Sequence, residues 1–191
     1  MKRISVLLLT IFLTTLALIA CGRKPPPNTT LSKKEPTSSN GIFVLSSSEV
    51  TEGGALPKEF TCDGTSATLP LSWSGVPEKT KSFAVIMHHI PGPRDSHWYW
   101  VLYNIPANVT YLEKNSIGIG TLGNNSVNGK TEYAPPCSKG PGEKLYTYTI
   151  YALSAEPQIS TSDSDVSRDV LLDTIKDITL ASAALNVTYA R

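Results

Sequence analysis

Apolar residues fill both sides of one segment in the middle of the chain, which predicts a strand buried on both faces. Phe83, Val85 and Met87 share one side of an extended chain, and Ala84 and Ile86 share the other. A strand that is apolar on both sides is typical of the interior of a sheet. We therefore expect this segment to lie at the centre of the fold.

Two further runs of β-forming residues follow this strand. The first, 98–103, comes after a turn rich in proline and glycine, and the second, 146–153, alternates apolar and polar positions. The spacing of Trp98 and Trp100 places both on one strand face, where packing in the core is expected. A Gly-, Asn- and Ser-rich segment, 117–130, predicts a long loop between the two runs.

The end of the chain has a helical pattern. Ser167 is a suitable N-cap, and Val170, Leu171 and Ile175 form an apolar stripe. A second short helix is predicted over 178–185. Strands first and helices last predict a mostly β domain with short C-terminal helices.

The first twenty residues have the organisation of an export signal. Lys2 and Arg3 precede an apolar run, 6–18, and Cys21 follows directly after a small residue. This arrangement resembles the bacterial lipobox, so we expect removal of 1–20 and acylation of Cys21. An uncleaved anchor is the alternative, although the apolar run is shorter than the roughly 20 residues of a membrane span. Acylation would hold the protein on a membrane of the bacterial cell envelope, at its periplasmic or extracellular face.

The next twenty residues, 21–40, are expected to form a flexible tether. Pro25-Pro26-Pro27 is locally stiff, and the remainder is rich in Thr, Ser and Lys with almost no apolar side chain. The folded part is therefore expected to span 41–191. About 150 residues suffice for one domain with a substantial core.

The charge of the chain indicates which partners it can bind, and its cysteines indicate whether a disulfide forms. The chain has 17 basic and 16 acidic residues, and loss of Lys2 and Arg3 would leave 15 basic ones. Because no basic stripe appears, nucleic acid is not expected as a partner. Cys62 and Cys137 remain after processing, and an even pair in an exported protein favours a disulfide. Two buried, reduced thiols are the alternative.

All three histidines flank the predicted turn. His88 and His89 are neighbours on a strand and point to opposite faces, so they do not readily share one metal ion. The alternative is a metal site in which His89 and His97 meet across the turn, with Asp95 or Asp63 as the third ligand. We expect hydrogen-bonded loop histidines, with no metal site and no cofactor. Ser96 adjoins His97, but the chain has no Gly-x-Ser-x-Gly elbow, so a hydrolase is not expected.

Short motifs occur in a fixed order from residue 42 to the end of the chain. They are Thr61-Cys62-Asp63-Gly64, Pro70-Leu71-Ser72-Trp73-Ser74-Gly75-Val76-Pro77, Thr80-Lys81-Ser82-Phe83-Ala84, Tyr103-Asn104-Ile105-Pro106-Ala107, Tyr133, Pro136-Cys137, Tyr146, Tyr151-Ala152-Leu153, Ala181-Ser182-Ala183 and Tyr189-Ala190-Arg191. Together they resemble the phosphatidylethanolamine-binding protein family, in its bacterial branch. The resemblance implies a β-sandwich with a small cavity at one end that receives phosphate and phospholipid head groups. The last two motifs fit the family's final helix and tail. No common enzymatic reaction defines the family.

The residues that correspond to the family's cavity depart from its pattern. The family's Asp-Pro-Asp-Ala-Pro loop falls on 89–93, where both acids are replaced, and the histidine of its next strand falls on Tyr99. Its Gly-Pro-Cys-Pro-Pro loop falls on 134–138, and its His-Arg-Tyr triplet falls on 144–146. The implied ligand-binding residues are Asp63, His89, Tyr99, Lys144 and Tyr146. Asp63 is alternatively a turn former before a glycine.

The altered residues predict a more cationic cavity, because two acids are lost and a lysine is gained. Such a cavity suits a small anionic or phospholipid-like head group, which would accept charge-assisted hydrogen bonds. We therefore expect a membrane-anchored, non-enzymatic binding protein. The alternative is a protein-interaction or inhibitor module with a degenerate cavity, for which a protein partner replaces the small ligand.

Overall fold

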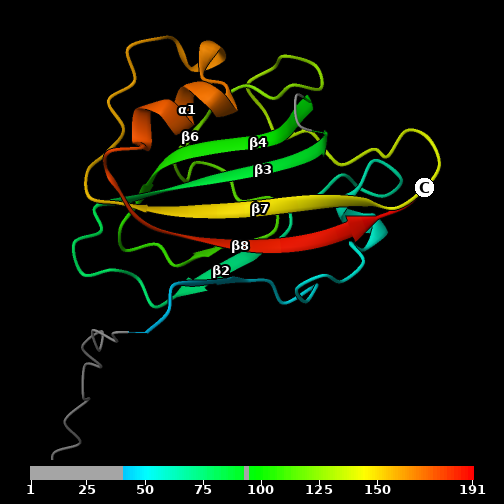
Figure 1. The fold of residues 1–191 in the computed structure, drawn as a ribbon, viewed down its shortest axis with the longest axis horizontal. Helices are drawn as coiled ribbons and strands as arrows, with labels where there is room; N and C mark the ends of the chain where they lie inside the picture. Colours follow the sequence, from blue (N-terminus) through cyan, green and yellow to red (C-terminus); the bar gives the residue numbers. More distant parts are fainter. Residues whose placement is uncertain (1–40, 93–94) are drawn as a thin grey trace, which may run out of the picture. The chain divides into compact units, whose positions relative to one another are not determined.

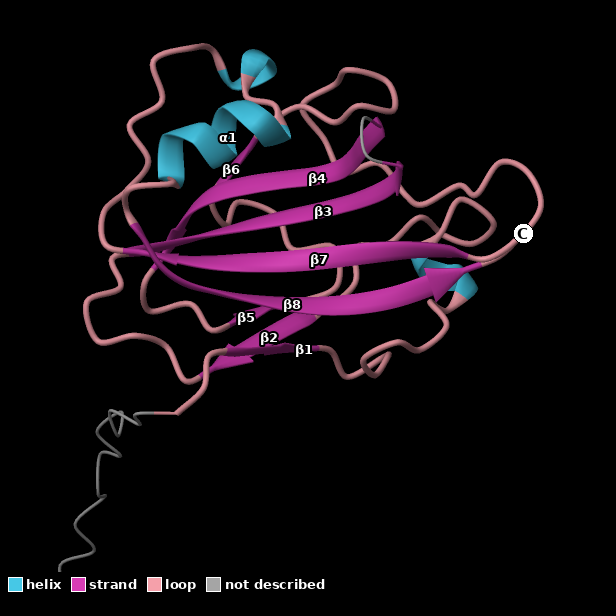
Figure 2. Ribbon diagram, viewed as in Figure 1, coloured by secondary structure: helices cyan, strands magenta, loops and turns pink. Residues whose placement is uncertain are grey.

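The computed structural model describes residues 41–92 and 95–191, so the predicted export signal (1–20), Cys21 and the tether (21–40) lie outside the described residues. The described part consists mainly of two antiparallel sheets (Figures 1 and 2). The mostly β fold predicted from the sequence is confirmed. The smaller sheet has the order β1-β2-β5, with β1 at Val44–Ser46, β2 at Leu71–Ser74 and β5 at Tyr111–Leu112.

The larger sheet carries the long strands and has the order β6-β4-β3-β7-β8. Its strands are β6 (Thr121–Leu122), β4 (Asp95–Pro106), β3 (Ser82–Gly92), β7 (Lys144–Leu153) and β8 (Thr179–Tyr189). Short 3-10 helices occur at Lys58–Phe60 and Asp163–Asp165. The α-helix α1 (Arg168–Ile175) lies over the β4 side of this sheet (Figure 1).

The central strand β3 separates two apolar clusters, as its sequence pattern predicts. Phe83, Val85 and Met87 are fully buried in the larger cluster, to which residues of both sheets contribute. Ala84 and Ile86 are fully buried in a smaller cluster on the other face, beneath α1. Strand β3 is therefore buried on both faces at the middle of the five-stranded sheet.

Strand β4 contains an extra residue opposite β3. Met87 pairs with Trp100 and His88 pairs with Trp98, so Tyr99 is the additional residue of a β-bulge. Trp100 is consequently buried in the larger cluster, while Trp98 packs against the smaller one. The prediction that both tryptophans share one face is wrong, because the bulge shifts the alternation by one residue.

The predicted helix after Ser167 is confirmed. The Ser167 side chain accepts a hydrogen bond from the backbone N–H of Val170, and Leu171 and Ile175 are fully buried beneath the helix. The helix has only eight residues. Among the residues that the structure describes, no helix is long and apolar enough to cross a bilayer.

The second predicted helix, 178–185, is wrong, and the chain forms strand β8 in its place. This strand pairs antiparallel with β7 from Thr179 to Tyr189, so the expected final family helix at 181–183 is also absent from this position. Alanine and leucine favour helix locally, but pairing with β7 satisfies the backbone groups of the whole segment. Alternate side chains such as Val187 then enter the core.

The described chain starts at the end of the large sheet where β3 begins. Gly41 lies beside Gly75 and Ala181, with which it lines a hollow of about 320 Å³. Ala181 pairs with Ala152, which pairs with Phe83 near the start of β3. Figure 1 shows this starting point and the carboxyl terminus on opposite sides of the domain.

Candidate functional site

A surface cavity of about 350 Å³ lies at the far end of β3, where three strands meet two loops. Strands β3, β4 and β7 contribute side chains, and so do the loop after β6 and the segment before β7. The lining residues are His89, Pro91, His97, Tyr99, Ser126, Val127, Pro135, Cys137, Lys139 and Lys144. Three of the five predicted ligand residues, His89, Tyr99 and Lys144, therefore meet in one cavity.

Tyr146 packs behind two of the lining side chains. Its ring centroid lies 5.3 Å from that of His89 and 5.4 Å from that of Tyr99. Tyr99 reaches this position because the β-bulge turns its side chain toward the larger core. The three rings come from three neighbouring strands, so the sheet itself fixes this wall of the site.

The Tyr146 side chain is fully buried and its hydroxyl forms no hydrogen bond of ordinary geometry within the described part of the chain. Burial, and then the neighbouring Tyr99, raise the pKa of Tyr146, so the hydroxyl stays neutral. Burial also raises the pKa of Tyr99. Both phenols therefore remain hydrogen-bond donors across the physiological pH range.

His89 is oriented by the backbone of the next strand. Its Nδ1 lies 2.6 Å from the carbonyl oxygen of Leu145. A carbonyl only accepts, so Nδ1 carries a proton and the other ring nitrogen, Nε2, is left for different partners. Nε2 accepts a hydrogen bond when the ring is neutral and donates one when the ring is protonated.

Two lysines supply positive charge to the cavity. The Nζ of Lys144 donates a hydrogen bond of 2.6 Å to the carbonyl oxygen of Lys139, which fastens the loop to the start of β7. An ammonium group has three donors, so two remain for other acceptors. The described lining residues comprise two lysines, two histidines and no carboxylate.

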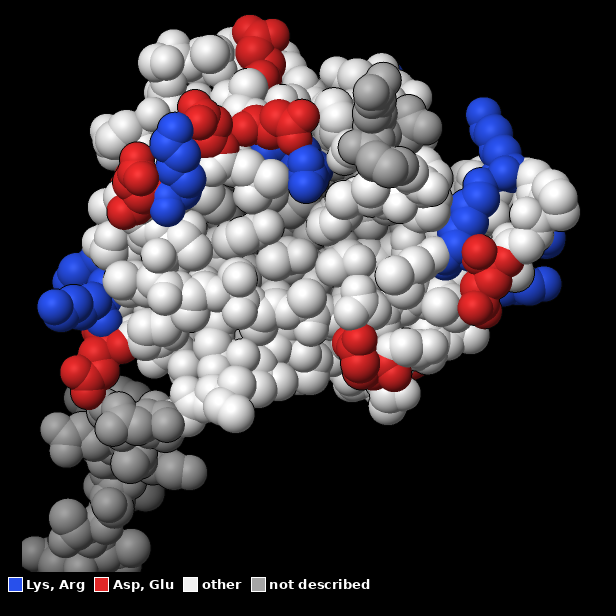
Figure 3. Space-filling view, in the orientation of Figure 1, with Lys and Arg blue, Asp and Glu red and all other residues white. Residues whose placement is uncertain are grey.

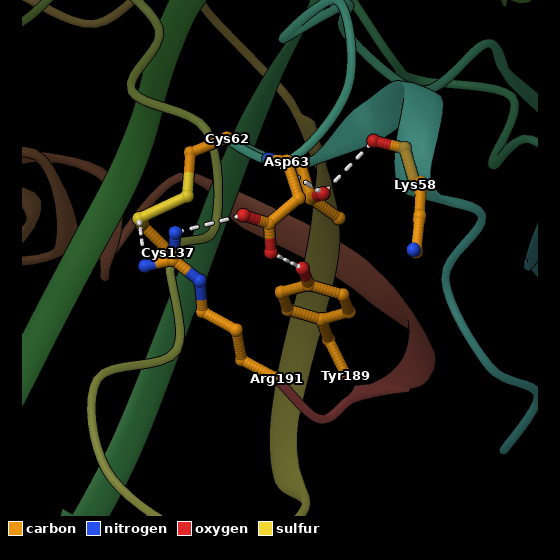
Figure 4. The surroundings of a disulfide bond; sticks show 7 residues. Lys58, Cys62, Asp63, Cys137, Tyr189 and Arg191 are labelled. Carbon is orange, nitrogen blue, oxygen red and sulfur yellow. Dashed lines mark hydrogen bonds and ion pairs between the residues drawn. A yellow bond between two sulfur atoms is a disulfide. The ribbon is translucent and has the colours of Figure 1, made fainter.

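Asp63 is not among the lining residues, although it lies next to one of them. Its carboxylate accepts a hydrogen bond from the Tyr189 hydroxyl, and its Oδ1 lies 2.9 Å from Nη2 of Arg191 (Figure 4). Arg191 also places Nη1 3.6 Å from the sulfur of Cys137, which does line the cavity. Asp63 therefore stands behind the disulfide, engaged by the chain's own carboxyl-terminal residues.

The alternative role of Asp63 as a turn residue fits its local structure. It lies in a turn in which its backbone N–H and that of Gly64 donate to the side chain and the backbone of Thr61. A Cβ atom at Gly64 would collide with the carbonyl of Lys58, so this position requires glycine. The turn fixes the Asp63 side chain beside Cys62.

The predicted disulfide between Cys62 and Cys137 is confirmed. The two Cα atoms are 5.2 Å apart and the cysteines are separated by 75 positions in the sequence. The N–H of Cys62 also donates to the carbonyl oxygen of Pro136 at 3.0 Å. The bond ties the Asp63 turn to the loop that carries Pro135 and Lys139 into the cavity.

His88 lies on the opposite face of β3 from the cavity. Its pKa is lowered to about 4, first by burial and then by Arg168 and His89. Its Nδ1 is buried and forms no hydrogen bond with any described residue. The expectation that His88 and His89 point to different environments is therefore met.

Sequence reasoning missed part of the cavity. Lys139 was not among the predicted ligand residues, and His97 was considered only for a metal. The signal for Lys139 was its position two residues after a cysteine whose loop the family places at the cavity. No such signal exists for Ser126 and Val127, because a long loop brings them to the site from a distant stretch of sequence.

The fold agrees with comparisons to known proteins. Residues 46–190 match the family model described as phosphatidylethanolamine-binding protein. The chain belongs to this family. Among curated relatives, a UPF0098 protein of Methanothermobacter thermautotrophicus is 33% identical over 143 residues, covering 72% of this chain and 92% of that protein. The UPF0098 protein YbcL of Escherichia coli is 35% identical over 130 residues, covering 60% and 70%.

Two crystal structures of family members share the fold. A putative phosphatidylethanolamine-binding protein homologue from Chlamydia trachomatis, CT736, superposes with a TM-score of 0.72 at 28% identity, covering 80% of this chain and 99% of that one. YbcL of E. coli, described as a member of the mammalian family, gives a TM-score of 0.70 at 28% identity, covering 79% and 99%. The bacterial family membership indicated by the sequence motifs is thus confirmed.

Proposed function

We propose that the protein binds a small anionic ligand, such as a phosphate ester or a phospholipid head group, in the cavity at the end of β3. It does so without catalysis or a cofactor, and a lipid on Cys21 holds it to a membrane of the bacterial cell envelope. The observation that carries the binding proposal is the cavity lining, with two lysines, two histidines and no carboxylate among its described residues.

The donors of the cavity suit a phosphate group. Lys144 retains two donors beside its bond to Lys139, and the free Nε2 of His89 donates when the ring is protonated. A hydrogen bond to a charged group contributes roughly 1.5–3 kcal/mol. The ring of Tyr99, held from behind by Tyr146, adds an apolar surface for the organic part of the ligand.

Calorimetric titration with inorganic phosphate, glycerol 3-phosphate, phosphoethanolamine and a lysophospholipid tests this proposal. Lys144→Ala should weaken binding of each phosphate about tenfold, the equivalent of one charge-assisted hydrogen bond. Lys81→Ala is the matched control, because Lys81 is exposed at the opposite end of β3. Wild-type protein that binds none of these ligands would contradict the proposal.

A protein-interaction or inhibitor role is the second candidate function, and the outer face of the large sheet favours it. Figure 3 shows no charged side chain over the middle of this face. Leu145 on β7 and Leu180 on β8 are 52% and 40% exposed there. A folded protein that binds no anion in the titration would favour this second role over the first.

The lipid anchor has its own test. Cys21→Ala protein expressed in bacteria should move from the detergent phase to the aqueous phase in a detergent-partition assay, because the acylated residue is lost. Lys24→Ala is the control, since it changes the neighbouring tether and leaves Cys21 in place. Unchanged partitioning of the Cys21→Ala protein would refute acylation at this position.

A further inference from the structure

A carboxylate beside the disulfide of the cavity is already paired with a cation of the same chain. Asp63 lies 2.9 Å from the guanidinium of Arg191 and accepts a hydrogen bond from Tyr189. Arg191 contacts the sulfur of Cys137, which lines the cavity. The Asp63 side chain is 23% exposed, so its charge is only partly screened by water. Arg191 therefore neutralises a negative charge that would otherwise lie beside Cys137 and attract a cationic group in the cavity.

This pairing changes which head groups the cavity suits. Phosphoethanolamine carries a phosphate and an ammonium group, and the ammonium needs an acceptor, usually a carboxylate. The described lining residues offer none, and Lys139 and Lys144 repel a third positive charge. Glycerol 3-phosphate presents a phosphate of the same kind with hydroxyl groups in place of the ammonium.

We propose that the cavity selects phosphate esters without a positively charged group, and that Arg191 sets this selectivity by occupying Asp63. This inference rests on the proposed anion binding and names the ligand class more narrowly. Arg191 acts through Asp63 and is therefore a positioning residue. Its half-exposed side chain, at 51%, makes substitution there compatible with the fold.

The test compares the dissociation constants of glycerol 3-phosphate and phosphoethanolamine for the same protein. Wild type should bind glycerol 3-phosphate about tenfold more tightly or better, the size of one lost charged contact. Arg191→Gln should bring the ratio toward one, mainly through tighter binding of phosphoethanolamine, because the negative charge of Asp63 beside the disulfide is then no longer neutralised. Arg191→Lys keeps a cation beside Asp63 and should keep the wild-type ratio.

Two further variants separate selectivity from stability. Asp63→Asn combined with Arg191→Gln removes both charges and should restore the preference for glycerol 3-phosphate. Arg168→Gln, on the opposite face of the sheet beside His88, is the matched control and should leave the ratio unchanged. A ratio of affinities within one variant does not depend on how stable that variant is.

The outcomes distinguish this inference from the proposed function. Equal wild-type affinity for the two ligands, or a preference for phosphoethanolamine, overturns the selectivity alone. A ratio that Arg191→Gln leaves unchanged overturns the role of Arg191. A failure of wild type to bind either ligand or inorganic phosphate overturns the proposed function, and this inference with it.

Discussion

The two faces of the β3–β4 hairpin give the neighbouring residues His88 and His89 opposite environments. On the cavity face, His89 is oriented by the carbonyl of Leu145 and keeps one ring nitrogen available. On the helix face, the buried Nδ1 of His88 has no hydrogen-bond partner among the described residues, and burial next to Arg168 lowers its pKa to about 4. One face thus exposes an oriented polar group, while the other keeps its histidine neutral under α1.

The two faces of the hairpin therefore differ in the residues that they carry and in their expected roles. The cavity face carries the lysines, the aromatic wall and the loop fastened by the disulfide. The helix face carries a small apolar cluster under a short helix. Substitutions on the cavity face should therefore alter ligand binding, and those on the helix face should alter stability alone.

The largest effect is expected from removing the disulfide. The double substitution Cys62→Ala and Cys137→Ala should lower the free energy of unfolding by about 4 kcal/mol, because the bond closes a long loop in the unfolded chain. Phosphate affinity should fall as well, since the loop with Pro135 and Lys139 loses its fastening. Urea denaturation and titration well below the melting temperature measure the two effects. Undiminished affinity would show that the loop holds its place without the bond.

The matching substitution on the helix face is Leu171→Ala. Leu171 is fully buried under α1, so its truncation should lower the free energy of unfolding by about 3 kcal/mol. The affinity of the folded fraction for phosphate should stay the same. Leu172→Ala, at a partly buried neighbour, should have a smaller effect on stability. A loss of phosphate affinity in Leu171→Ala would show that the helix face also influences ligand binding.

His88 should make stability depend on pH. Because its folded-state pKa lies below the unfolded value of about 6.5, its contribution is retained above pH 6.5 and lost as the pH falls toward 4. We expect a loss of about 1–2 kcal/mol after allowance for solvent screening. Chemical denaturation from pH 7 to 4 should show a shallower decline in His88→Gln. His97→Gln, at an exposed histidine, is the control. An equal decline in wild type and His88→Gln would show that His88 does not cause the pH dependence of stability.

The smallest effect is expected at the start of α1. Ser167→Ala removes the hydrogen bond to the N–H of Val170 and should lower the free energy of unfolding by about 1 kcal/mol. Ser167→Asp should retain most of the stability, since its carboxylate can also cap the helix. Thermal denaturation of the two variants measures the difference, and phosphate affinity should not change. A Ser167→Ala protein as stable as wild type would mean that water caps the helix equally well.

Local sequence patterns predicted that β3 is buried on both faces, because its apolar residues leave neither face polar. They failed at Trp98 and at β8. A bulge shifts alternation without leaving a local mark, and β8 contains alanines and a leucine that favour a helix until β7 is available for pairing. Both failures result from tertiary pairing, which depends on residues far away in the sequence.

The candidate site was predictable where its residues lie on strands. His89, Tyr99 and Lys144 are at strand ends that meet in the sheet, so ordered motifs located them. Ser126, Val127 and Lys139 come from loops whose path is set by contacts such as the disulfide. The ion pair between Asp63 and Arg191 was also not predictable from the sequence, because these distant residues meet only after folding.

The positions of Gly41 and the cavity at opposite ends of β3 have a consequence for access. The seven residue steps from Ser82 to His89 alone span roughly 23 Å. The point at which the described chain begins is thus separated from the cavity by the length of the sheet. A ligand can therefore enter the cavity without passing that point.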